Sequence, residues 1–129
     1  MRLLFITIAS FFFTNLLAQN AGCKNELKIR VSIKGIIPGD SIISYKALSN
    51  AEEIVAEVNE YQILSFTATL YPGNEVSEFS VAGAKFSENN RKWFLKLRPG
   101  DHVYFSNIRA KIGNGISVCL KPAYYRISE

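Results

Sequence analysis

The side chains best suited to chemistry are one histidine and one adjacent pair of carboxylates. His102 follows Asp101, an order in which a carboxylate can orient an imidazole as a base, but no serine or cysteine is marked out as its nucleophile. Glu52 and Glu53 are neighbours, and adjacent side chains on an extended or turning chain diverge, so a solvated surface is favoured over a cation site or an acid–base pair. Neither pattern supplies the clustered ligands that a metal needs. We therefore expect no enzyme, no metal and no cofactor.

Cys23 and Cys119 are the two cysteines of the 129-residue chain. In an oxidising compartment such a pair is more often bridged than free, and the bridge would close a loop of about 97 residues, for which the chain-entropy estimate is roughly 4–5 kcal/mol. Alternation argues against the pairing, because Cys119 lies opposite its apolar neighbours Val118 and Leu120, whereas Cys23 falls in phase with Leu27. We predict the Cys23–Cys119 disulfide despite this objection.

The competing prediction for Cys23 is a lipid anchor. Ala21-Gly22-Cys23 resembles the end of a lipobox, which would make the protein an outer-membrane lipoprotein. Against this, Asn20 stands where an aliphatic residue belongs, and polar or small residues separate Leu17 from the cysteine. The disulfide is favoured, and the lipoprotein stays the alternative.

Residues 1–18 are predicted to be a secretory signal peptide. Arg2 is the positive residue, Leu3–Leu17 is mostly apolar but shorter in its uninterrupted runs than the ~20 residues of a membrane span, and Ala18 is a small residue for cleavage. The alternative is an uncleaved anchor. We expect an exported protein, in the periplasm or at the cell surface, whose single domain is 19–129.

The charge of the predicted mature domain is mild. Without Arg2, the 15 basic residues of the chain become 14 against 11 acidic ones, a net charge of +3. This balance gives no reason to expect nucleic-acid binding. The domain, about 110 residues long, is large enough to bury a core of its own.

The segment Phe79–Ile112 predicts a strand, a helix, a tight turn and a long strand. Ser87 suits the N-cap of the helix, Glu88 the first turn, and Lys96 and Arg98 the last turn, the order of charges that the helix dipole favours. Pro99-Gly100 then ends the helix. Three apolar side chains at helical spacing are expected on the sheet and three basic ones in water: Trp93, Phe94 and Leu97, and Arg91, Lys92 and Lys96.

Alternating polarity predicts the strands. Two rows should be buried: Leu27, Ile29, Val31 and Ile33, and Leu64, Phe66, Ala68 and Leu70. In His102–Ile112 the apolar set changes phase after Phe105, which indicates a bulge near Ser106-Asn107. Pro122 cannot donate to a ladder, so the last strand is expected to be an edge or to be broken there. We predict an all-β fold, an immunoglobulin-like β-sandwich of about seven strands with one short helix.

Several short motifs follow one another over the last two-thirds of the chain: Phe79-Ser80, Gly83-Ala84-Lys85-Phe86-Ser87, Lys96-Leu97-x-x-Gly100-Asp101-x-Val103-Tyr104-Phe105, Ile108-x-Ala110-Lys111 and Val118-Cys119-Leu120-Lys121-Pro122. In this order they resemble the C-terminal domain of GldM, the periplasmic shaft protein of gliding motility and type IX secretion in Bacteroidetes. The resemblance extends more weakly to Ile54–Leu70, and it favours a turn and then a strand for the ambiguous Leu48–Val58. The chain departs from the pattern at Gly113-Asn114-Gly115, where a Pro-Asp-Gly type of turn is expected.

The resemblance implies a non-catalytic interaction module of the periplasm or cell envelope. In the GldM family the corresponding domain lies at the distal end of a membrane-anchored shaft and contacts outer-membrane-associated ring components. We expect a stand-alone GldM C-terminal-like domain, without the shaft's membrane helix and long helical first domain. Its partner would be a protein of a gliding or type IX secretion-like complex, and membrane contact is expected only if Cys23 is lipidated.

The last strand is the candidate partner surface. Pro122 marks it as edge-like, and Tyr124-Tyr125-Arg126 supplies residue types enriched at interfaces, with Tyr124 and Arg126 as the expected contacts. The alternative is that Tyr125 and Ile127 are core and Tyr124 an isolated surface aromatic. The competing function is a small secreted enzyme or inhibitor on a β scaffold, which a deep pocket holding His102 with an acid and a hydroxyl would favour.

Overall fold

The computed structural model describes Cys23 and residues 26–129. The predicted signal peptide and its cleavage site after Ala18 lie outside these residues. The described part contains nine strands and two short helices. The prediction of an all-β, sandwich-like fold is therefore confirmed, although the number of strands and helices was underestimated.

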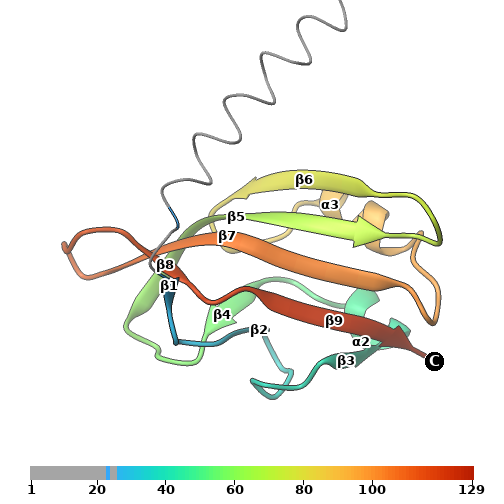
Figure 1. Ribbon diagram of the computed structural model, residues 1–129, viewed down its shortest axis with the longest axis horizontal. Helices are drawn as coiled ribbons and strands as arrows, with labels where there is room; N and C mark the ends of the chain where they lie inside the picture. The colour runs from blue at the N-terminus through green and yellow to red at the C-terminus, as the bar shows by residue number, and fades with distance from the viewer. Residues whose placement is uncertain (1–22, 24–25) are drawn as a thin grey trace, which may run out of the picture.

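Seven strands form one mixed sheet, the main sheet (Figure 1). Its two central strands, β5 and β7, are the longest, and β7 pairs with β8 through its second half and with β9 through its first half. The edges are β6 on one side and β1 and β3 on the other, the last two pairing in parallel with β8 and β9. The seven strands are Glu26–Leu27 (β1), Ile42–Ser44 (β3), Tyr61–Tyr71 (β5), Ser77–Ala82 (β6), His102–Ile112 (β7), Val118–Leu120 (β8) and Ala123–Ser128 (β9).

A second layer covers one face of the main sheet. It consists of the antiparallel pair Val31–Ile33 (β2) and Ile54–Ala56 (β4), with the helices Tyr45–Ser49 (α2) and Glu88–Phe94 (α3). The first predicted strand is thus two strands, since β1 belongs to the main sheet and β2 to the second layer. The hydroxyl of Tyr125 on β9 accepts a hydrogen bond of 3.0 Å from the backbone N–H of Ile33 on β2, which joins the layers.

Aromatic side chains fill the space between the layers. Phe94 of α3 lies edge-on to Phe86, with ring centroids 4.9 Å apart, and to Phe105 of β7, at 6.5 Å. Phe66 of β5 meets Phe105 in the same way, at 5.7 Å. These four residues are at most 8% exposed, so they form the centre of the core. Pairs of this geometry add about 0.5–1.5 kcal/mol each to what their buried area contributes.

Helix α3 begins as predicted and ends earlier than predicted. Ser87 is its N-cap, with its hydroxyl accepting from the N–H of Asn90 while the Asn90 side chain accepts from the N–H of Ser87. Because the helix ends at Phe94, its last turn carries Arg91 and Lys92 instead of Lys96 and Arg98.

The predicted buried face of the helix is partly wrong. Phe94 and Leu97 are each 1% exposed, as expected, but Trp93 is 39% exposed. Lys92 and Lys96 are exposed to solvent as predicted, whereas Arg91 is half-buried. The helix ends at Phe94, and of the three apolar side chains predicted to face the sheet only Phe94 and Leu97 are buried.

Helix α2 was missed by the sequence reasoning. It lies just before and within the start of the ambiguous segment Leu48–Val58, and the Ser44 hydroxyl caps it by accepting from the N–H of Ala47 at 3.1 Å. Leu48 is fully buried and anchors this helix to the core.

Two bulges shape the central pair of strands. Ser65 faces Arg109 and Thr67 faces Ser106, so β7 has one extra residue there, and Asn107 has the left-handed φ of 51°. This confirms the predicted bulge. A second extra residue, Leu64, lies on β5 between Ile63 and Ser65, so Ile63 takes the buried place predicted for Leu64.

Candidate functional site

The last strand is internal to the main sheet. β9 lies between β7, with which it is antiparallel, and β3, with which it is parallel. Of the two alternatives expected at Pro122, the edge strand is therefore wrong and the break is right, since Pro122 lies between the end of β8 and the start of β9. Partner binding by addition of a strand to β9 is impossible, and any contact through this strand must use its side chains.

The side chains of β9 alternate between the core and the outer face of the sheet. Tyr125 and Ile127 are at most 1% exposed, so the core alternative is right for these two residues. Tyr124 is 45% exposed, and Arg126 is also exposed. The two predicted contact residues therefore lie side by side on the outer face.

Tyr124 is not an isolated surface aromatic. Paired residues of neighbouring strands share a face of the sheet. The register places Tyr124 opposite Tyr104, and Arg126 opposite His102 on one side and Ile42 on the other. Tyr71 of β5 is in turn opposite His102. We call this group the outer aromatic surface; it consists of Ile42, Tyr71, His102, Tyr104, Tyr124 and Arg126.

A direct contact orders the middle of this surface. The Tyr124 hydroxyl and Nδ1 of His102 share a hydrogen bond, and their rings stack with centroids 5.5 Å apart and an interplanar angle of 22°. Asp101 does not pair with His102, because its carboxylate accepts from the backbone N–H groups of Gly73 at 3.1 Å and Arg98 at 2.8 Å. The imidazole thus orients the exposed side chain of Tyr124, and the carboxylate holds two turns together.

Tyr104 keeps its proton firmly. Burial raises the pKa of its hydroxyl above the usual value of 10.0, and the negative charge of Glu26 and the neighbouring Tyr71 act in the same direction. The hydroxyl is therefore a neutral hydrogen-bond donor and acceptor over the physiological range. Beside it, the hydroxyl of Thr69 donates to the carboxylate of Glu78 at 3.3 Å, which leaves Glu78 as an acidic border of the surface.

The predicted disulfide is present at the far end of the same sheet. Cys23 and Cys119 are bonded, with their Cα atoms 5.4 Å apart. Cys119 pairs with Arg109, on the face opposite Leu120, as the alternation indicated. The objection to the bridge fails because the segment of Cys23 approaches this outer face, where the Asn107 amide oxygen lies 3.0 Å from the Cys23 sulfur. A bridged Cys23 has no thiol to carry a lipid.

The paired carboxylates diverge, as expected. Glu53 forms an ion pair with Lys34 at 3.8 Å, while the exposed Glu52 contributes its backbone carbonyl, which accepts from the N–H of Phe86 at 2.9 Å. Within residues 23 and 26–129, no three His, Cys, Asp or Glu side chains are grouped as metal ligands would be.

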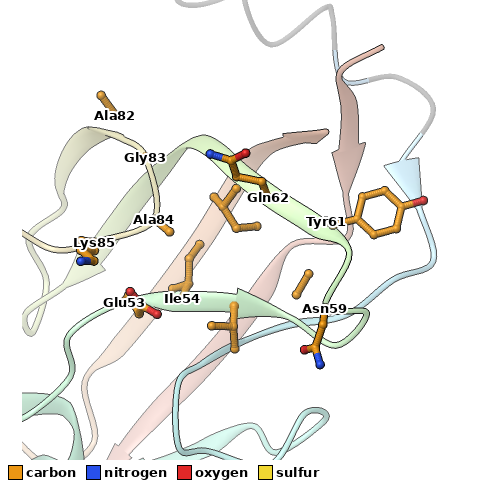
Figure 2. A pocket seen from close by; sticks show the side chains of 12 residues that line it. Glu53, Ile54, Asn59, Tyr61, Gln62, Ala82, Gly83, Ala84 and Lys85 are labelled. Carbon is orange, nitrogen blue, oxygen red and sulfur yellow. The ribbon is translucent and has the colours of Figure 1, made fainter. Parts of the chain in front are cut away.

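An open pocket of about 480 Å³ lies where the two layers part (Figure 2). Ile54 comes from β4 and Glu53 precedes it, Gln62 comes from β5, and Ala82–Lys85 run from the last residue of β6 across to Glu53, which forms a β-bridge with Lys85. The buried Ile54 lines its base. Sequence reasoning missed this pocket because two consecutive strands create it by diverging after a turn, which no residue pattern marks.

The chain matches no protein-family model and no curated protein significantly. In the part of the chain that the structure describes, the helices are too short to cross a membrane. The Cys23–Cys119 bridge is compatible with an oxidising, exported compartment.

Proposed function

We propose that this protein is a non-catalytic interaction module of the cell envelope, similar to the C-terminal domain of GldM. Its partner would be a protein of a gliding or type IX secretion-like complex in the periplasm or at the cell surface. The order of motifs from Phe79 to Pro122 supports the relationship, and the disulfide is compatible with the compartment.

The outer aromatic surface is the observation that carries the proposal of binding. It combines three tyrosines, a histidine and an arginine on three adjacent strands of one sheet, with Ile42 on a fourth. Tyrosine and arginine are enriched at protein interfaces, and tyrosine offers a large contact area at a small cost in conformational entropy. Since Tyr124 stands on an internal strand and is held by His102, it is already ordered before a partner arrives.

A double variant, Tyr124→Ala with Arg126→Ala, tests the proposal. Truncation of one interface hot spot costs at least about 2 kcal/mol, which is about a 30-fold loss of affinity. Recovery of the envelope partner in a pull-down should therefore fall by at least about tenfold even if one of the two side chains contributes little. The melting temperature should stay close to that of the wild type, because both side chains are exposed.

A matched control uses an exposed apolar residue elsewhere. Ile116 is 87% exposed, in the turn between β7 and β8, and Ile116→Ser should leave the recovery unchanged. A photo-crosslinking residue at position 124 should label the same partner, and one at position 116 should not. Full recovery with the double variant, or equal loss with Ile116→Ser, would overturn the proposal.

A further inference from the structure

A second surface lies at the end of the molecule near the C-terminus, where α2, α3 and the end of β9 gather, away from β1 and β8 (Figure 1). Two large apolar side chains are exposed there, Trp93 at 39% and Leu95 at 52%. Their neighbours Phe94 and Leu97 occupy the core, so the alternate positions turn outward. The exposure of the single tryptophan is thus built into the end of α3.

Cations surround these apolar side chains. Nζ of Lys96 lies over the ring of Trp93, 4.4 Å from its centroid. Three further cations are exposed in the same region: Lys46, Lys92 and Arg98. Among residues 26–129, no carboxylate lies within ion-pair distance of any of these four groups. We call Trp93, Leu95 and the four cations the basic apolar surface.

The basic apolar surface contains an open cleft of about 710 Å³. Leu95, Leu97 and Pro99 give it apolar walls. Lys46, Lys96 and Arg98 line it with positive charge, against the single acidic residue of the lining, Glu129. The hydroxyl of Tyr45 donates to the carbonyl of Leu95 at 3.1 Å, so α2 fixes the position of the exposed leucine. Apolar walls beside unpaired cations fit a ligand that has both an apolar part and an anionic group.

We propose that the basic apolar surface docks onto an anionic phospholipid membrane. Surfaces that lie in the membrane interface combine tryptophan and leucine with lysine and arginine. The tryptophan ring enters the headgroup level, and the cations contact the lipid phosphates. Lysine is depleted at protein–protein interfaces, and three of these four cations are lysines, which favours a membrane over a protein partner. This contact needs no lipid on Cys23, and it is independent of the outer aromatic surface.

Trp93 is its own reporter, because the chain has one tryptophan. Oxidised protein lacking residues 1–18 would be titrated with vesicles of phosphatidylglycerol and phosphatidylethanolamine while the emission spectrum is recorded. We expect a blue shift, quenching by brominated acyl chains, and reversal at high salt, since exposed charges are screened. Phosphatidylcholine vesicles, inorganic phosphate and glycerol phosphate should leave the spectrum unchanged. A shift with the soluble phosphates would instead mean a headgroup-sized anion site and would overturn membrane docking.

Two charge variants separate this surface from general electrostatic attraction. Lys46→Gln with Lys92→Gln should weaken vesicle binding by about 30-fold, about fivefold for each cation near the membrane surface. The control, Lys28→Gln with Lys121→Gln, makes the same change in net charge at exposed sites away from this end and should change binding less than about twofold. Leu95→Ser should weaken binding and reduce the quenching by brominated lipid.

The proposal is overturned by an unshifted spectrum with anionic vesicles, or by equal losses in the two charge variants. Tyr124→Ala with Arg126→Ala should bind vesicles like the wild type, so the result is separate from the test of the outer aromatic surface. Far-UV circular dichroism of each variant excludes unfolding as the cause of a loss.

Discussion

Replacing Tyr125 by phenylalanine tests how the two layers of the fold are joined. The substitution keeps the aromatic ring, which lies edge-on to Phe105 with centroids 6.2 Å apart, and removes the hydroxyl that accepts from the N–H of Ile33. Tyr125 and Ile33 are each 1% exposed, so water cannot replace the lost partner without opening the core.

The cost follows from the direction of that N–H group. The N–H of Lys34 donates to the carbonyl of Glu53, the residue before β4, at 3.0 Å. Backbone groups of an antiparallel strand alternate in direction, so the N–H of the preceding residue, Ile33, points away from β4. Without the hydroxyl it becomes a buried donor with no partner, which costs about 1–3 kcal/mol. Since 1 kcal/mol corresponds to about 4–8 °C for a small domain, the Tm should fall by about 4 °C or more.

Urea unfolding of the oxidised protein, followed by far-UV circular dichroism, measures this cost. Tyr124→Phe is the matched control: it removes the hydroxyl of an exposed neighbour on the same strand and should change the free energy of unfolding by less than about 0.5 kcal/mol. If Tyr125→Phe stays within 0.5 kcal/mol of the wild type, or if both variants lose the same amount, the Ile33 hydrogen bond does not stabilise the native state in the way we describe.

Three more outcomes are expected. Burial raises the pKa of the Tyr125 hydroxyl above 10.0, outweighing the hydrogen bond from Ile33. The unfolded chain therefore loses this proton first as pH rises, so the contribution of Tyr125 to stability is complete below about pH 10 and is lost above it. Tyr125→Phe should show a shallower alkaline fall in Tm than the wild type. Parallel curves of Tm against pH for the two proteins would contradict this. Phe94→Ala should cost about 3–5 kcal/mol in urea unfolding and Trp93→Ala less than about 1 kcal/mol, the reverse order being the contrary result. Reducing Cys23–Cys119 should cost roughly 4–5 kcal/mol, and the Cys23→Ser, Cys119→Ser variant should unfold at the midpoint of the reduced wild type.

Sequence patterns predicted those features of the fold that depend on interactions between residues close together in the chain. The cap at Ser87 depends on a hydroxyl and a backbone N–H three residues away, and the structure has it. The bulge at Asn107 was visible because the apolar phase changes between Phe105 and Ile108. Its counterpart at Leu64 was invisible, since Ile63 and Leu64 are both apolar and no change of phase shows which one turns inward.

Long-range pairing could not be predicted from the same patterns. Alternation gave the outward direction of Tyr124 and Arg126 correctly, but the parallel pairing of β3 with β9 joins segments from opposite ends of the chain and leaves no local trace. Of the two outcomes expected at Pro122, the break is present and the edge is not, because β3 covers that side of β9. The predicted burial of Trp93 is wrong for a related reason. Helical spacing placed Trp93 on the same face as Leu97, but the helix ends at Phe94, so the burial of Leu97 does not bring Trp93 onto the sheet.

The internal position of β9 also decides when the molecule can finish folding. Residues 123–128 complete the core with Tyr125 and Ile127 and lie between two strands that are synthesised earlier. Until they are available, β3 has no neighbour within the main sheet and the first half of β7 has an open edge. Contacts between such distant segments slow folding, because the entropy of closing the chain is lost before the contacts form. A chain interrupted at Pro122 would therefore expose two unpaired strands, a ready target for proteolysis and for association with other chains.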